Sequence, residues 1–382
     1  MTQATQPLRT IGSPSWHGRA RATRRFPRLA APVLLAGFAA ACDESPTDRA
    51  DAAQTPLRVQ VQKPPPGVDI DRRFAPGRVV DAQGRLGWYP HEGGLLRYRV
   101  NIRFGLEPHT MPEGWHFGRV SAVATDSANR VFVFQRGAVA DPIIVFDSEG
   151  KYLRSFGREF DFANEHGLRI DRYDNVWVTD NRGHTVRKFR NDGELLLTLG
   201  IEDQAGTTEE TFDRPADIAF GPNDEVYVAD GYGNSRVVKF DPDGDFLRTW
   251  GSPGSGPGEF NLVHSLATDS RGNVYVSDRE NSRIQIFDSE GNLLRIWTHL
   301  GSTQGIFITP DDAMWIITHR DNIEGVTYGS LAGRIMRVDI DTGEILGAME
   351  SPGHWIDVSD AGEIYIASLT GSVFKWYQGW LP

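Results

Sequence analysis

Short apolar strands separated by polar turns recur along the chain from about residue 115 onward. Three segments share the form V-x-V-x-D, at residues 176–180 (VWVTD), 226–230 (VYVAD) and 274–278 (VYVSD). Each is followed by a turn, a second apolar strand that ends in Phe, an acidic turn with Gly, and a last strand. Alternation of apolar and polar residues over such short spans, without a helical period, predicts four-stranded antiparallel units.

Weaker copies of the same unit at residues 131–135, 314–318 and 364–368 bring the number of units to six. Repeats of about 40 to 50 residues are typical of propeller blades, so we predict an all-β fold, a six-bladed β-propeller over residues 91–382. The last copy lacks a fourth strand, and residues 94–104 are expected to supply it and so close the ring. An open solenoid is the alternative, but six copies match a common closed number.

One position of the repeat carries histidine in alternate units. Ten residues before the second strand of each unit the chain has, in order, Ser121, His166, Ala216, His264, Gln304 and His354. Because innermost strands line the channel of a propeller, alternate units place these three side chains about 120° apart around the axis. The pattern therefore predicts a three-histidine metal site with an open position, for which zinc is the expected ion. The alternative is that each histidine forms a hydrogen bond within its own blade.

Composition and charge set limits on the partners. The net charge of −11 argues against binding to nucleic acid or to an anionic membrane surface. The 41 glycines and 22 prolines suit a fold with many turns. Cys42 is the single cysteine, so an intrachain disulfide is excluded.

The N-terminal region has the pattern of an export signal. An Arg-rich stretch precedes an apolar run at residues 29–41, which is too short to span a bilayer and suits a signal peptide. We predict a signal peptide over residues 1–42. It resembles the lipoprotein type, lipidated at Cys42, which would place the protein in the periplasm or at the cell surface, with this anchor as its membrane contact. Ala39-x-Ala41 also fits an ordinary cleavage site at the same bond. Residues 43–90, polar and Pro-rich, are predicted to be a flexible tether.

The loops after the V-x-V-x-D strands contain two kinds of polar residue: those that brace the turn and those that the turn does not require. An Asp-x-x-x-Asn-x-Arg turn pairs its Asp and Arg and so braces the blade. We assign this bracing role to Asp230, Asn234, Arg236, Asp278, Asn281 and Arg283. Arg136, Tyr232 and Arg279 remain, and all three follow second strands, at one end of the propeller.

The units resemble NHL repeats, and segments such as DGYGNSR and VHSL resemble the core of peptidyl-α-hydroxyglycine α-amidating lyase, a six-bladed propeller that completes peptide C-terminal amidation. The resemblance implies a zinc ion on His166, His264 and His354, with Tyr232, Arg136 and Arg279 as catalytic residues. The implied reaction breaks the C–N bond of a peptidyl α-hydroxyglycine, giving an amide and glyoxylate. Zinc would act as a Lewis acid, the tyrosine would take the hydroxyl proton, and the arginines would hold the carboxylate.

The chain also departs from that family. The family's calcium ion binds backbone carbonyls that correspond to Val123 and Leu168, together with an Asp directly after the third histidine, where this chain has Trp355. This change argues against calcium. Gly233 replaces a disulfide-forming cysteine. A small-molecule or peptide substrate is expected, with a separate protein supplying any hydroxyglycine. Two other functions stay open: a metal-dependent enzyme with a different substrate, and a non-enzymatic NHL module that binds partners at the cell surface.

Overall fold

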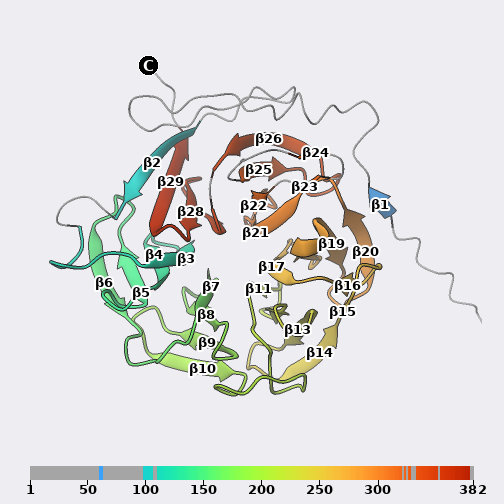
Figure 1. Cartoon of the computed structure of the whole chain (residues 1–382), viewed down its shortest axis with the longest axis horizontal. Coiled ribbons are helices and arrows are strands. Elements are labelled where there is room, and N and C mark those ends of the chain that lie inside the picture. The colour runs from blue at the N-terminus through green and yellow to red at the C-terminus, as the bar shows by residue number, and fades with distance from the viewer. Residues whose placement is uncertain are drawn as a thin grey trace, which may run out of the picture. The chain divides into compact units, whose positions relative to one another are not determined.

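The computed structural model describes residues 60–62, 98–105, 110–320, 322–323, 326–327, 333–351 and 353–378. The predicted signal peptide, Cys42 and most of the predicted tether lie outside the described residues. Six four-stranded antiparallel sheets form a ring around a central axis (Figure 1), which confirms the prediction of an all-β six-bladed propeller. A single turn of 3-10 helix, Arg279–Asn281, is the one helical element in the described part. It follows that no helix there is long and apolar enough to cross a membrane.

Each blade is described from its innermost strand outward. Blade 1 contains β3 (Arg119–Thr125), β4 (Val131–Arg136), β5 (Ile143–Phe146) and β6 (Tyr152–Phe156), and blade 2 contains β7 (Glu165–Ile170), β8 (Val176–Asp180), β9 (Thr185–Phe189) and β10 (Leu195–Leu199). Blade 3 contains β11 (Ile218–Phe220), β12 (Val226–Asp230), β13 (Arg236–Phe240) and β14 (Phe246–Trp250), and blade 4 contains β17 (Val263–Thr268), β18 (Val274–Asp278), β19 (Arg283–Phe287) and β20 (Leu293–Trp297). Blade 5 contains β21 (Ser302–Ile308), β22 (Met314–Arg320), β25 (Arg334–Val338) and β26 (Ile345–Glu350), and blade 6 contains β27 (Trp355–Val358), β28 (Ile364–Ser368), β29 (Ser372–Gln378) and β2 (Tyr98–Phe104).

The ring closes through a strand from the N-terminal side. Strand β2 pairs antiparallel with β29, and Val100 lies opposite Trp376. This strand, Tyr98–Phe104, lies within residues 94–104, where the sequence predicts it. One further pairing was not anticipated: β1 (Gln60–Gln62), inside the predicted tether, pairs in parallel with the outer strand β20. Two short pairs stand outside the blades, β15 (Ser252–Pro253) with β16 (Glu259–Phe260), and β23 (Asn322–Ile323) with β24 (Val326–Thr327).

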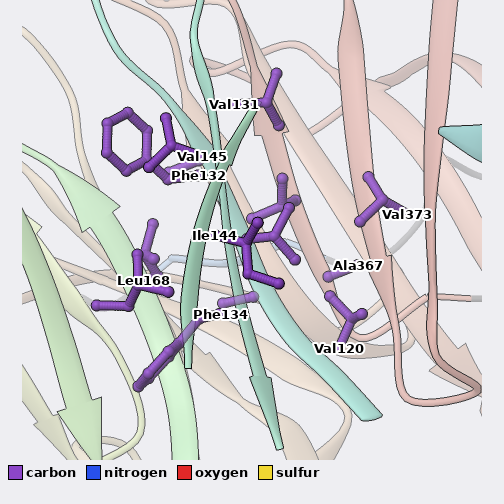
Figure 2. Close-up of a cluster of buried hydrophobic side chains, with 14 of the residues drawn as sticks. Val120, Val131, Phe132, Phe134, Ile144, Val145, Leu168, Ala367 and Val373 are labelled. Atoms are coloured by element: carbon purple, nitrogen blue, oxygen red, sulfur yellow. The ribbon is translucent and has the colours of Figure 1, made fainter. Parts of the chain in front are cut away.

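The core lies between the blades. Strands β8, β12 and β18 are buried along their whole length, because each blade packs both of its faces against neighbours. Figure 2 shows Val131 and Ile144 of blade 1 between Leu168 of blade 2 and Ala367 of blade 6. Outer strands such as β14 alternate between exposed and half-buried residues. The continuous apolar second strands of the sequence are therefore explained by burial on both faces.

Strand direction determines which side chains share an end of the channel. Each second strand runs antiparallel to the innermost strand of its blade. The residue after a second strand therefore lies at the same edge as the start of the innermost strand. The hairpins between the outer strands turn at Gly193, Gly244 and Gly291, all with positive φ, as the Asp-Gly and Glu-Gly pairs predict.

Candidate metal centre and active site

The three predicted histidines lie together on the propeller axis. His166 is the second residue of β7, His264 is the second residue of β17, and His354 directly precedes β27. Their ring centroids are 4.9 to 5.1 Å apart, and one ligand nitrogen from each lies within 4.8 Å of the other two. All three side chains are buried. Three strands from alternate blades thus bring three imidazoles to one point.

The second nitrogen of each ring is fixed by the neighbouring blade. Nδ1 of His166, His264 and His354 lies 2.8, 2.6 and 2.7 Å from the backbone oxygens of Ala216, Gln304 and Ser121. A carbonyl oxygen only accepts, so each Nδ1 carries the proton and each Nε2 keeps its lone pair. These carbonyls belong to the repeat position that the histidines occupy in their own blades. The alternative that each histidine bonds within its own blade is therefore wrong.

The surroundings keep the imidazoles of His166 and His264 neutral. Burial holds the pKa of His166 and His264 well below the usual range, and the nearby Arg279 side chain lowers both further. The Nε2 atom of His264 is buried and has no hydrogen-bond partner in the described part of the chain. A neutral imidazole with an unused lone pair is the form that a metal ion needs.

Tyr232 reaches the histidines from the loop after β12. Its hydroxyl lies 3.0 Å from Nε2 of His166, and since that nitrogen has a lone pair, the hydroxyl donates to it. The Tyr232 ring also contacts the ring of His264 at a centroid distance of 5.8 Å. The side chain is half-buried. The phenol therefore stands between the three histidines and the mouth of the channel at this end.

Arg279 contacts the same hydroxyl, and Arg136, from a further blade, lies near enough to interact electrostatically with Tyr232. Nη1 of Arg279 lies 3.4 Å from the Tyr232 hydroxyl and 3.4 Å from Oε1 of Gln304. Arg136 donates from Nε to the backbone oxygen of Glu165 at 2.5 Å. Burial lowers the pKa of Arg136, while the nearby Tyr232 opposes that effect. Two guanidinium groups thus flank the phenol, a geometry that suits an anionic ligand group.

The bracing residues behave as predicted. Arg236 donates to Asp230 at 2.8 Å and Asn234 donates to the same carboxylate at 2.7 Å. The corresponding contacts in the next blade, Arg283 and Asn281 to Asp278, measure 2.6 and 2.8 Å. These pairs are confirmed as structural.

Glu165 and Gln304 belong to this end of the channel and were not assigned a role from the sequence. Burial raises the pKa of Glu165 to about 7. Gln304 orients two groups, since its backbone oxygen accepts from His264 and its side-chain oxygen from Arg279. The sequence did contain a hint for Gln304, because this polar residue stands in blade 5 at the repeat position where blades 2, 4 and 6 have histidine.

The histidine cluster fits zinc. It offers three neutral nitrogen ligands, a buried lone pair without a partner, and second nitrogens held by carbonyls, as metal-binding histidines are. His166, His264 and His354 would hold the ion.

Calcium does not fit at Val123 and Leu168. The carboxylate expected after the third histidine is Trp355, whose buried ring lies 4.7 Å from the guanidinium carbon of Arg169. Arg169 donates to the backbone oxygen of Ile306 at 2.9 Å, and Ile306 is the blade 5 counterpart of Val123 and Leu168 in the repeat. Arg169 thus already binds the equivalent carbonyl of blade 5, and Trp355 offers no oxygen ligand to a calcium ion.

Comparisons with known proteins agree with this architecture. The NHL repeat family matches residues 212–240 and 260–287. Peptidyl-glycine alpha-amidating monooxygenase of Mus musculus is 38% identical over 194 residues, 43% of this chain and 20% of that protein. The probable peptidyl-alpha-hydroxyglycine alpha-amidating lyase of Caenorhabditis elegans is 36% identical over 142 residues, 36% of this chain and 40% of that protein. NHL repeat-containing protein 3 of Homo sapiens is 34% identical over 194 residues, 48% of this chain and 54% of that protein.

The similarity to these relatives covers less than two thirds of each of them. Among solved structures, a streptogramin B lyase superposes with a TM-score of 0.53 at 14% identity, over 74% of this chain and 98% of that one. A gluconolactonase from Xanthomonas campestris gives 0.53 at 14% identity, over 73% and 89%. These structures show the fold alone. The chain is a six-bladed β-propeller that matches the NHL repeat at residues 212–240 and 260–287 and resembles peptidyl-α-hydroxyglycine α-amidating lyase.

Proposed function

We propose that the protein is a zinc-dependent carbon–nitrogen lyase that cleaves a peptidyl α-hydroxyglycine to an amide and glyoxylate. The observation that carries the proposal is the convergence of three neutral imidazoles with Tyr232 and Arg279 at one end of the axis. The relatives named as amidating lyases support the choice of reaction.

The residues divide the chemistry between them. Bound zinc would supply Lewis-acid polarisation of the substrate oxygens. Tyr232 acts as the base that accepts the proton of the carbinol hydroxyl. The electron pair of that O–H bond forms the aldehyde C=O bond, the C–N bond breaks, and the leaving nitrogen takes the same proton back from Tyr232 to become the amide. Arg136 and Arg279 pair with the carboxylate that leaves in glyoxylate.

Metal content and glyoxylate release test the proposal together. The purified protein is expected to contain about one zinc per chain by elemental analysis and to release glyoxylate from α-hydroxyhippurate. His264→Ala is expected to lose both zinc and activity. His116→Ala is the matched control, because His116 is exposed and outside the cluster, and it is expected to lose neither.

The outcomes separate the rival functions. A protein without stoichiometric zinc would contradict a metal enzyme and favour a binding module. Zinc lost in His264→Ala, with no glyoxylate from α-hydroxyhippurate in the wild type, would keep the metal centre and overturn the substrate.

A further inference from the structure

A cavity of about 600 Å³ lies at the opposite end of the innermost strands from the histidines. It is lined by the last residues of β3, β7, β11, β17, β21 and β27: Thr125, Ile170, Phe220, Thr268, Ile308 and Val358. The volume is within the range of sites for small organic ligands. No part of the proposed lyase chemistry uses this cavity.

The floor of the cavity separates it from the histidine site. Arg169 binds the buried Asp217 through two contacts of 2.9 and 2.7 Å, and it also donates to Ser265 Oγ at 3.3 Å. Together with the stacked ring of Trp355, these groups come from blades 2, 3, 4 and 6. The charge of Arg169 is thus already compensated at the floor.

Asp357 is the charged group at the floor that lacks a counter-ion. Its residue is 3% exposed, and Oδ2 accepts from the backbone nitrogen and the hydroxyl of Thr125 at 2.9 and 2.7 Å. Within the described residues Asp357 forms no ion pair. Its other oxygen, Oδ1, accepts no hydrogen bond there, and it is not among the fully buried atoms that lack a partner. One carboxylate oxygen therefore remains open to the cavity.

The rim of the cavity is negatively charged, as Asp357 at the floor is. Six aspartates line the cavity, against three cationic side chains. Two of those cations are already paired, Arg172 with Asp224, and Lys188 with Asp171 at 3.6 Å. Asp360 at the rim is exposed and carries a further negative charge. A cationic ligand is favoured over an anionic one.

The walls select an organic cation over a metal ion. Ile170, Phe220 and Ile308 present apolar surface, and the histidine cluster is the one group of potential metal ligands brought together in the described part of the chain. A carboxylate at the base of an apolar cavity suits an ammonium group carried on an apolar body.

We propose that this cavity is a second ligand site, which binds a small organic ammonium ion through Asp357 and its apolar walls, independently of the lyase reaction. The ammonium group donates to the open oxygen of Asp357, and the hydrocarbon part packs against the ring of inner-strand ends.

Binding of three hexyl compounds to the full-length protein tests the proposal by calorimetry at pH 7.5. Hexylammonium is expected to bind saturably, hexanol at least about tenfold more weakly, and hexanoate not at all. Asp357→Asn is expected to weaken hexylammonium binding about tenfold or more, to the level of hexanol. Asp243→Asn, an exposed aspartate in the hairpin after β13, is the matched control and should leave binding unchanged.

A second variant keeps the test decisive if Asp357→Asn does not fold. Ile308→Trp narrows the cavity without removing the carboxylate, and it should weaken hexylammonium binding while zinc content stays at the wild-type level. Equal affinity for hexanol and hexylammonium, or no saturable binding of hexylammonium, would overturn the proposal. Unchanged binding in Asp357→Asn would overturn it as well.

Discussion

Two layers of side chains along the propeller axis hold polar groups in opposite ways. We call them the histidine level, which contains His166, His264 and His354, and the arginine level, which contains Arg169 and its partners. At the start of the innermost strands, the ring nitrogens of three histidines meet within 4.8 Å of one another, and Nε2 of His264 has no hydrogen-bond partner in the described part of the chain. Three residues further along, Arg169 places a cation on the axis, and Asp217 and the oxygen of Ile306 satisfy it. The first cluster could hold a metal ion supplied from outside the chain, whereas the second already contains a cation of the chain, Arg169.

The difference lies in what fixes each group. Backbone oxygens of Ser121, Ala216 and Gln304 hold the histidines, so three different residues can occupy those positions without changing the support. The side chains of Asp217 and Ser265 bind Arg169 in addition to the backbone oxygen of Ile306, so this network depends on which residues stand at those two positions. We therefore expect the histidine level to tolerate changes in neighbouring blades and the arginine level to resist them.

The largest expected effect is on catalysis at the histidine level. Tyr232→Phe removes the hydroxyl that donates to His166 and keeps the ring packed on His264. Loss of a proton acceptor lowers kcat by about 10²- to 10⁴-fold. Zinc content should stay at one per chain, since no ligand nitrogen changes. Glyoxylate release measured alongside elemental analysis checks both; undiminished turnover would remove Tyr232 from the mechanism.

The next effect is on stability at the arginine level. Arg169→Leu leaves Asp217 buried, at 0% exposure, without its cation. Breaking a buried pair in this way costs about 3–5 kcal/mol of unfolding free energy. Urea unfolding measures the loss. Trp355 contacts both Arg169 and His354. Zinc content is nevertheless expected to persist in the folded fraction, because the backbone oxygens that bind the three histidines are unchanged.

A double variant isolates the buried charge. Arg169→Leu combined with Asp217→Asn should recover part of the lost stability, because the orphaned carboxylate is removed. If the double variant is as unstable as the sum of the two single variants, the charge pair is not the cause, and packing of the Arg169 side chain on Trp355 would be the better explanation.

The sequence repeat allowed the histidine cluster to be predicted, but it did not allow the arginine network to be predicted. Histidine recurs at one repeat position in three blades, so counting along the sequence brought His166, His264 and His354 to one point. Arg169 stands three residues after its histidine position, Asp217 and Trp355 share the position directly after it, and none of the three residue types recurs at its position in another blade. Their association depends on how side chains cross the channel, which a repeat count does not show. The sequence does show that Arg169 is a charged residue between the apolar Leu and Ile of the segment HGLRI, and a buried charge of this kind needs a partner.

A smaller effect is expected at the mouth of the histidine level. Arg279→Lys keeps the positive charge and loses the planar fork that reaches Tyr232 and Gln304. The Michaelis constant for α-hydroxyhippurate should rise about tenfold, with a smaller change in kcat, if Arg279 holds the carboxylate. Steady-state kinetics separates the two constants. A fall in kcat alone would mean that Arg279 acts on the reaction step.

A pH-dependent effect is expected at Asp357, beside the arginine level. Burial raises its pKa to about 6 from 3.8, opposed by the bonds from Thr125 and by the charge of Arg169, and aided by Asp360. The folded state therefore binds more protons than the unfolded state between about pH 4 and 6, and the stability contribution of Asp357 falls as pH rises through that window. Asp357→Asn removes this dependence.

Relative to the wild type, the Asp357→Asn variant should thus gain stability from pH 4 to pH 7, by at most about 3 kcal/mol for a shift of about two pKa units. Urea unfolding at half-unit steps of pH measures the difference, with Asp243→Asn as the exposed control. A difference between variant and wild type that is constant with pH would show that Asp357 is ionised throughout, and that Arg169 compensates it as fully as it compensates Asp217.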